Sequence, residues 1–123
     1  MFTCVIRYEV RLDRLEEFRA YAHAWIGLIE RYGGTHHGYF APDPDAQDMP
    51  AAAFSFPGLG EAAPPNAGYA LFSFPDVESY TRYRADVAID PDCITATNRF
   101  QAAPCFTRYE RSFLRPIFDK ESS

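Results

Sequence analysis

The sequence predicts an α+β fold with strands and helices in the order β-α-β-β-α-(α)-β. Two observations carry this prediction. The hydrophobic period switches between two residues and 3.6 residues along the chain, and glycine, proline or aspartate marks each switch. This order defines a split βαβ arrangement, a four-stranded antiparallel sheet with helices on one face. With 123 residues, we expect a single domain over 1–123 with one core.

The first strand is predicted over residues 2–11, FTCVIRYEVR, where the side chains alternate between two faces. One face carries Phe2, Cys4, Ile6, Tyr8 and Val10, and the other carries Thr3, Val5, Arg7, Glu9 and Arg11. A long helix follows, with Asp13 and Glu16 predicted as a capping pair at its start. Gly33 and Gly34 are predicted to end it. Its apolar stripe comprises Leu15, Phe18, Ala22, Trp25, Ile29 and Tyr32.

The second predicted strand, THHGYFA at 35–41, contains two of the three histidines. Because neighbouring side chains of a strand point to opposite faces, His36 and His37 are not expected to bind one metal unless a bulge intervenes. The spacings HxH, HxxxH and HExxH are also absent, so we predict no metal site. The sequence does not decide which of these two histidines points away from the helices, because a shift of one residue in the strand pairing exchanges them. The third, His23, lies off the apolar stripe of the long helix and is expected to be exposed.

A proline-rich segment at 43–66 is predicted to be an insertion loop, longer than connections in compact domains usually are. Within it, AAFSFPGLG at 52–60 nearly repeats ALFSFPDVE at 70–78. We assign the third strand, 68–74, to the second copy because a helical pattern follows it. The first copy is expected to form an extra edge segment or to fold over an opening.

Two helices and a last strand are predicted in the remaining part of the chain. Pro75 suits the first turn of the first helix, and Asp76 its positive end. The apolar side of this helix consists of Val77, Tyr80, either Tyr83 or Arg84, and Val87. Asp90 is predicted to cap the second helix, with Pro91 at its first position. Its apolar side consists of Cys93, Ala96, Phe100 and Ala103, and the last strand is predicted over 105–114.

The composition argues against several classes of function. The formal net charge is −5 and no cluster of lysine and arginine occurs, so no nucleic-acid partner is expected. No run approaches the roughly 20 apolar residues of a membrane span, so no membrane partner is expected either. The start, MFTCVIRYEV, lacks the features of a cleaved signal, which favours the cytoplasm. The three cysteines, Cys4, Cys93 and Cys105, have no metal-ligand spacing, and we expect reduced thiols packed in the core.

The sheet face opposite the helices mixes apolar and charged side chains and is a predicted interaction surface. A twofold homodimer in which two such faces meet is the simplest arrangement, with the chain as its own partner. In VIRYEVRLDRLEEFRAY, GGTHHGYFAP, ALFSFPDVESYTRYR, DPDC and YERSFLRPI, the chain resembles the NIPSNAP family of the dimeric α/β-barrel superfamily. The resemblance spans nearly the whole chain and implies two ferredoxin-like subunits that form a barrel. It implies no reaction, because the family has no common catalytic motif, and the insertion at 43–66 departs from its pattern.

In such a barrel the interior is the sheet face opposite the helices. The candidate ligand-binding residues on it are Arg7, Glu9, either His36 or His37, Tyr69 and Arg108. The last strand offers to this face either Arg108 and Glu110 or Tyr109 and Arg111. Arginine binds carboxylates through paired hydrogen bonds and aromatic rings line apolar pockets, so we expect a small anionic or aromatic ligand. The alternative is that these residues form cross-strand ion pairs and packing contacts without chemistry.

Three functions are compatible with these residues. The first is a dimeric protein that binds a small molecule in the barrel without a catalytic motif. The second is a cofactor-independent enzyme, monooxygenase-like or isomerase-like, that acts on a small cyclic or aromatic metabolite. The third is a haem or metal binder that uses one inward histidine. The sequence contains no glycine-rich phosphate loop, nucleophile elbow or CxxC motif, so we predict no cofactor and leave open whether the chain is an enzyme.

Overall fold

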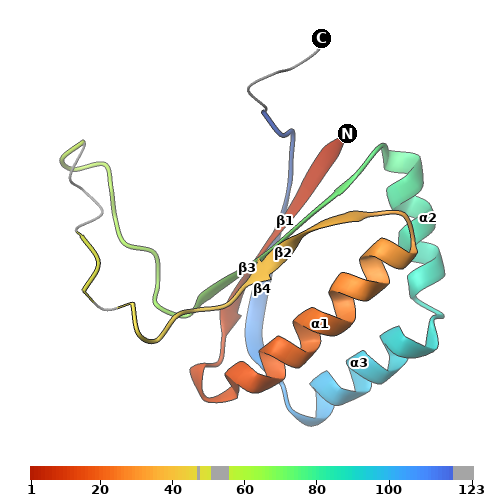
Figure 1. Ribbon diagram of the computed structural model, residues 1–123, viewed down its shortest axis with the longest axis horizontal. Coiled ribbons are helices and arrows are strands. Elements are labelled where there is room, and N and C mark those ends of the chain that lie inside the picture. The colour runs from red at the N-terminus through yellow and green to blue at the C-terminus, as the bar shows by residue number, and fades with distance from the viewer. Residues whose placement is uncertain (47, 51–55, 118–123) are drawn as a thin grey trace.

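The computed structural model describes residues 1–46, 48–50 and 56–117. The elements are β1 (Phe2–Val10), a 3-10 turn η1 (Leu12–Arg14), α1 (Leu15–Arg31), β2 (Thr35–Phe40), β3 (Ala67–Phe74), α2 (Val77–Val87), α3 (Pro91–Ala102) and β4 (Phe106–Leu114). The four strands form one antiparallel sheet in the order β2-β3-β1-β4, and the helices cover one face of it (Figure 1). The predicted split βαβ, ferredoxin-like arrangement is therefore confirmed. No helix in the described ranges has the length and apolar character needed to cross a bilayer.

The alternation of the central strand β1 determines which side chains enter the core. Cys4, Ile6, Tyr8 and Val10 are buried beneath the helices, whereas Arg7 on the opposite face stays partly exposed. The other large fully buried side chains come from α1, β3 and the residue that precedes β4: Phe18, Leu28, Ile29, Phe74 and Cys105. Each such apolar side chain stabilises the fold by roughly 1.5–3 kcal/mol when it leaves water. All three cysteines are free and buried, as predicted.

The start of α1 differs from the prediction. The chain first forms η1, and the N-cap residue Arg14 makes no side-chain capping hydrogen bond. Asp13 is an ion-pair partner instead, since its Oδ2 lies 3.1 Å from Nη2 of Arg11. This carboxylate is therefore turned back toward the preceding residues and does not cap the helix. The end of α1 is as predicted, because Gly33 adopts a left-handed φ of 94° and the Gly34 N–H donates to the carbonyl of Ile29.

β2 contains a β-bulge at its two histidines. His36 lies opposite Phe72 of β3, and Gly38 lies opposite the next residue, Leu71, so that His37 is the extra residue of the bulge. Gly38 has a φ of 119°, which only glycine adopts without a steric penalty from Cβ. The prediction for this strand named a bulge as the condition under which both histidines could bind one metal, but this bulge leaves them on opposite sides of the sheet.

The two histidines face opposite sides of the sheet, as the alternation of the strand predicts. The ring of His36 stacks on that of Tyr39 with 5.1 Å between centroids, and both lie on the helix side. His37 points to the open side, where its Nε2 is hydrogen-bonded to Oγ of Ser73 at 2.7 Å. The residue that faces away from the helices is therefore His37.

The connection between β2 and β3 forms no helix or strand within the described stretches 41–46, 48–50 and 56–66. In Figure 1 these stretches extend away from the sheet. The second copy of the repeated sequence forms β3, as predicted. Of the first copy, 52–60, residues 52–55 lie outside the described residues, and residues 56–60 form a turn and no strand.

α2 begins later than predicted, because Pro75 does not lie in its first turn. Asp76 is its N-cap, with the side chain accepting a hydrogen bond from the Ser79 N–H at 2.7 Å, so Pro75 precedes the helix. Val77 was predicted on the apolar side but is 70% exposed, because the helix begins beyond the edge of the core. Of the two alternatives at the next turn, Tyr83 is buried and Arg84 is exposed.

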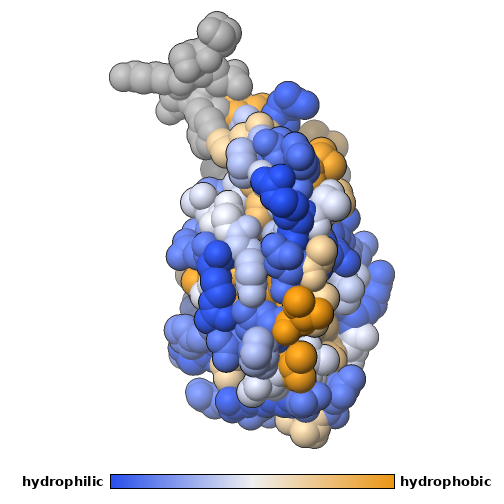
Figure 2. Space-filling view, turned by 90° about the vertical axis from the view of Figure 1, so that its right-hand side faces the viewer, coloured by the Kyte–Doolittle hydropathy of each residue, from blue (hydrophilic) through white to orange (hydrophobic). Residues whose placement is uncertain are grey.

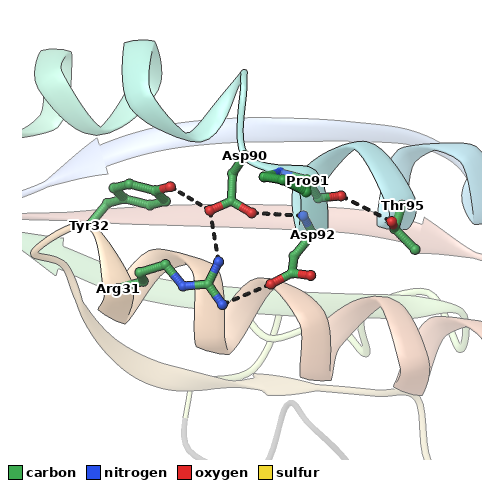
Figure 3. A network of polar contacts seen from close by, with 6 residues as sticks. All are labelled: Arg31, Tyr32, Asp90, Pro91, Asp92 and Thr95. Carbon is green, nitrogen blue, oxygen red and sulfur yellow. Dashed lines mark hydrogen bonds and ion pairs between the residues drawn. The ribbon is translucent and has the colours of Figure 1, made fainter.

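A buried carboxylate fastens the α2–α3 junction to the end of α1 (Figure 3). Asp90 caps α3, as predicted, and accepts the Asp92 N–H at 2.7 Å. Its other oxygen accepts from the Tyr32 hydroxyl and from Nη1 of Arg31, the latter at 2.7 Å. These bonds, first that of Tyr32 and then that of Arg31, lower the pKa of Asp90 to about 2. Asp90 is therefore ionised at neutral pH, and the three helices are held as one layer.

Candidate ligand-binding site

The predicted site residues divide between the two faces of the sheet. The open face carries Arg7, Glu9, His37, Tyr69 and Arg108, and His36 lies on the helix face. β4 contributes Arg108 and Glu110 to the open face, while Tyr109 and Arg111 lie on the helix face. The structure thus brings five of the six candidates onto one surface.

The charged residues of the open face pair with one another across β1 and β4. Arg7 Nη1 lies 2.6 Å from Oε1 of Glu110, and Arg108 Nη1 lies 2.7 Å from Oε2 of Glu9. These pairs follow from the register, which sets Arg7 opposite Glu110 and Glu9 opposite Arg108. Their side chains are a third to more than half exposed, so each pair contributes little to stability. The ladder of ion pairs matches the structural alternative stated for these residues.

His37 also has a structural partner on this face. Its Nε2 contacts Oγ of Ser73, which in turn lies 2.7 Å from Oγ1 of Thr3. Ser73 and Thr3 are buried, so the chain of hydrogen bonds satisfies two hydroxyls that would otherwise lack partners.

A cavity of about 350 Å³ lies on the helix side, between the sheet and the three helices. Its floor is apolar and buried, with Ile6, Phe72 and Val87 among the lining side chains. Its walls are aromatic and consist of Tyr8, Tyr21, Trp25, Tyr39, Tyr80, Tyr83 and Tyr109. Its rim is exposed and carries Arg84 of α2 and Arg111 of β4. We call this space the aromatic cavity; its size falls within the range of small-molecule sites.

Burial raises the pKa of several tyrosine hydroxyls of the aromatic cavity, among them those of Tyr8, Tyr39 and Tyr83. It raises the pKa of Tyr8 to about 12, although the Tyr39 hydroxyl and the positive charge of Arg111 act in the opposite direction. The pKa values of Tyr39 and Tyr83 are also raised, mainly by burial. The oxygens of Tyr8 and Tyr39 lie 3.4 Å apart, which is a long contact. These hydroxyls are available to a ligand as neutral donors and acceptors.

Two buried nitrogen atoms near the cavity have no hydrogen-bond partner in the described part of the chain: Nε1 of Trp25 and Nε2 of His36. Trp25 lines the aromatic cavity, whereas His36 stacks behind its wall on Tyr39. Nδ1 of His36 accepts the Gly38 N–H at 2.8 Å, which assigns the ring proton to Nε2. Burial lowers the pKa of His36 to about 4, so the ring is neutral at physiological pH.

A second cavity of about 380 Å³ lies between α1 and α3. Its walls are largely small side chains, among them Ala20, Ala24, Gly27 and Ala96. Its carboxylates and guanidiniums are already paired, Glu17 with Arg99 at 2.7 Å and Asp92 with Arg31 at 2.9 Å. It therefore offers less for ligand recognition than the aromatic cavity. His23 borders it and is exposed, as predicted.

The described residues contain no group of three or more His, Cys, Asp or Glu side chains placed to hold a metal ion. The lining of the aromatic cavity, within the same ranges, includes no histidine. The inward histidine of the third predicted function corresponds to His37 on the open face, where its Nε2 is hydrogen-bonded to Oγ of Ser73 at 2.7 Å.

Comparison with known proteins shows the fold and no more. No family model matches the chain, and no curated protein is significantly similar to it. Two solved NIPSNAP structures from Burkholderia xenovorans are similar, both described as uncharacterized. A NIPSNAP-like domain protein is 20% identical (98% of this chain, 88% of that chain, TM-score 0.68), and a NIPSNAP domain protein is 18% identical (99% and 100%, TM-score 0.69). SnoaB, a cofactor-independent oxygenase from Streptomyces nogalater solved as its N63A mutant, is 15% identical (98% and 95%, TM-score 0.52). The predicted resemblance to NIPSNAP proteins is confirmed for the fold.

Sequence reasoning does not select Trp25 or Arg84 as site residues, and it names Arg111 only as an alternative for the face that forms the barrel interior. Trp25 belongs to the apolar stripe of α1, where core packing is the ordinary interpretation. Arg111 shares a face of β4 with Tyr109 and Phe113, and this alternation was a usable signal. A pattern in which an arginine shares a strand face with aromatic residues indicates a polar opening at the edge of the core.

Proposed function

We propose that the chain binds a small aromatic molecule in the aromatic cavity. The observation that carries this proposal is the lining, in which aromatic walls with neutral hydroxyls surround a buried apolar floor. Such walls stack on a planar ring, and the hydroxyls orient its polar atoms.

An enzyme of the cofactor-independent monooxygenase or isomerase kind is the second candidate. The fold shared with SnoaB favours it, at an identity that carries no residue roles across. Chemistry on a phenol or an acidic carbon needs a positioned base whose pKa lies near the working pH. Tyr8, Tyr39 and Tyr83 have raised pKa values, and His36, with a pKa of about 4, stands outside the cavity lining. These observations support binding better than catalysis.

We further propose that the chain forms a homodimer through the open face of the sheet. Val5 and Leu71 are only partly buried there, and the ladder of Arg7, Glu110 and Arg108 surrounds them with both signs of charge. A twofold axis would set this mixed ladder against a copy of itself, with cations facing anions. The buried free thiols of the three cysteines agree with a reducing compartment, and we keep the cytoplasm as the proposed location.

A substitution that closes the opening of the aromatic cavity tests the binding proposal. Thr97 of α3 is exposed and lines the aromatic cavity, so Thr97→Phe would fill the opening without disturbing the core. We expect 2-naphthol to bind the unmodified chain, and the substitution to weaken binding by about tenfold or more, measured by isothermal titration calorimetry. Asn98→Phe is the matched control, because Asn98 is also exposed on α3 but does not line the cavity. Absence of binding, or equal binding by both variants, would count against the proposal.

A further inference from the structure

We propose that the ligand of the aromatic cavity is an aromatic carboxylate, with its ring inside the cavity and its negative charge held at the rim by Arg84 and Arg111. This inference rests on the proposed function, since it names the class of molecule that the same cavity takes. It adds two features that an aromatic lining alone does not require: a charge on the ligand and a fixed orientation.

The first argument is that the two rim guanidiniums lack carboxylate partners. Six other arginines lie within 4.0 Å of a carboxylate, namely Arg7, Arg11, Arg31, Arg82, Arg99 and Arg108. Within residues 1–46, 48–50 and 56–117, neither Arg84 nor Arg111 has such a pair. The chain has 17 acidic residues against 12 basic ones, so carboxylates are not scarce. Two uncompensated cations beside one cavity are a site for an anion.

The contacts that these arginines do make hold them at the rim. Nη1 of Arg84 donates to the Tyr80 hydroxyl at 3.2 Å, and the guanidinium carbon of Arg111 lies 5.7 Å from the ring centroid of Tyr109. Both partners line the cavity and are aromatic, so the arginines are positioned without being neutralised. Their fields also converge. Burial raises the pKa of the Cys4 thiol on β1, and Arg111 and Arg84 both act against that rise.

The second argument is the gradient of burial across the cavity. The rim residues Arg84, Thr97 and Arg111 are exposed, whereas the floor residues Ile6 and Phe72 are buried. A carboxylate at the rim keeps part of its hydration and gains paired hydrogen bonds from arginine, while a charge on the floor would be desolvated. The ring therefore enters first and the carboxylate stays at the opening.

The third observation is that Trp25 lines the aromatic cavity, so an aromatic carboxylate that enters ring first would pack against its indole.

The test compares two probes of equal shape and different charge. The affinities of 2-naphthoate and its neutral amide, 2-naphthamide, are measured on the full chain by calorimetry. We expect 2-naphthoate to bind about tenfold more tightly, and Arg84→Gln or Arg111→Gln to remove this preference while leaving the amide unaffected. Arg82→Gln is the control, because Arg82 lies two residues away on α2 and pairs with Glu78 at 3.5 Å. Should a glutamine variant fail to fold, Arg84→Lys and Arg111→Lys keep the charge but lose the paired geometry, and we expect intermediate affinity.

A spectroscopic readout locates the probe. The chain has one tryptophan, so the indole N–H of Trp25 gives a single side-chain cross-peak in a ¹H–¹⁵N spectrum. We expect that cross-peak to shift with 6-hydroxy-2-naphthoate. Equal affinity for acid and amide would overturn the charge assignment and leave the proposed function standing, provided 2-naphthol competes with both. Preference for the acid that survives both arginine substitutions would overturn the role of the rim. Failure of all these probes to bind would overturn the binding function together with this inference.

Discussion

His36 shows how a single buried group ties stability to pH. Its ring stacks on that of Tyr39 and lies tilted against that of Phe72, and its Nδ1 accepts a hydrogen bond from the Gly38 N–H. Burial lowers its pKa from 6.5 to about 4, with His37 acting in the same direction and Glu30 against it. Between pH 6.5 and 4, His36 is therefore protonated in the unfolded chain and neutral in the folded chain. The free energy of unfolding decreases as the pH falls through that window.

We expect His36→Phe to flatten this part of the pH profile. Phenylalanine keeps a stacking ring and cannot titrate. In the unmodified chain, His36 lowers the free energy of unfolding by up to about 2 kcal/mol between pH 7 and pH 5, and we expect this decrease to be absent from the variant. Urea unfolding at the two pH values measures the difference. His23→Phe serves as control, because His23 is exposed on α1. An equally steep profile in His36→Phe would show that other groups cause the acid sensitivity.

At the scale of elements, the turn between α1 and β2 depends on close packing at one glycine. A Cβ atom on Gly34 would lie 2.6 Å from Cγ2 of Ile29 and 2.8 Å from Cζ of Phe74. Both neighbours are fully buried side chains of the core and have little room to move. Gly27, within α1, has no heavy atom within 4 Å of such a Cβ. The same substitution is therefore expected to have opposite effects at the two positions.

Gly34→Ala should destabilise the fold by about 1–3 kcal/mol, because the added methyl group overpacks the core. Gly27→Ala should stabilise it by about 0.5–1 kcal/mol, because alanine loses less backbone entropy in a helix. Denaturant unfolding of both variants measures the two signs side by side. A neutral or stabilising Gly34→Ala would mean that Ile29 and Phe74 can move apart more easily than their burial indicates.

The elements also show what the sequence could and could not predict. The cap at Asp90 and the end of α1 at Gly33 were predictable, because each depends on a few consecutive residues. The bulge at His37 was not, since it depends on the pairing of β2 with β3. Predicting the aromatic cavity would require more information, because Trp25, Arg84 and Arg111 come from α1, α2 and β4. Their proximity can be inferred only when the strand order of the sheet and the orientation of the side chains of β4 are known.

At the scale of the whole molecule, the two sides of the sheet have different roles. The helix side holds the core and the aromatic cavity, and its outer surface is well suited to water. Figure 2 shows the side at which α2 meets α3, where hydrophilic side chains dominate and hydrophobic ones form small groups. The open side has no such layer among the described residues, and its ladder of paired charges encloses partly buried apolar side chains. A second copy is the partner that this pattern fits.

The dimer proposal is tested at the centre of the open face. Leu71 of β3 lies beside Val5 of β1 in the register, so Leu71→Glu would set a charge in the middle of the proposed interface. We expect the unmodified chain to have about twice the 14.0 kDa mass of one subunit in light scattering after gel filtration, and Leu71→Glu to have the mass of one. Ile89→Glu, at a position 79% exposed beside the α2–α3 junction, should leave the dimer intact. A monomeric unmodified chain, or a dimeric Leu71→Glu, would exclude this interface. Binding of 2-naphthol by a monomeric Leu71→Glu variant would then show that the aromatic cavity is complete within one subunit.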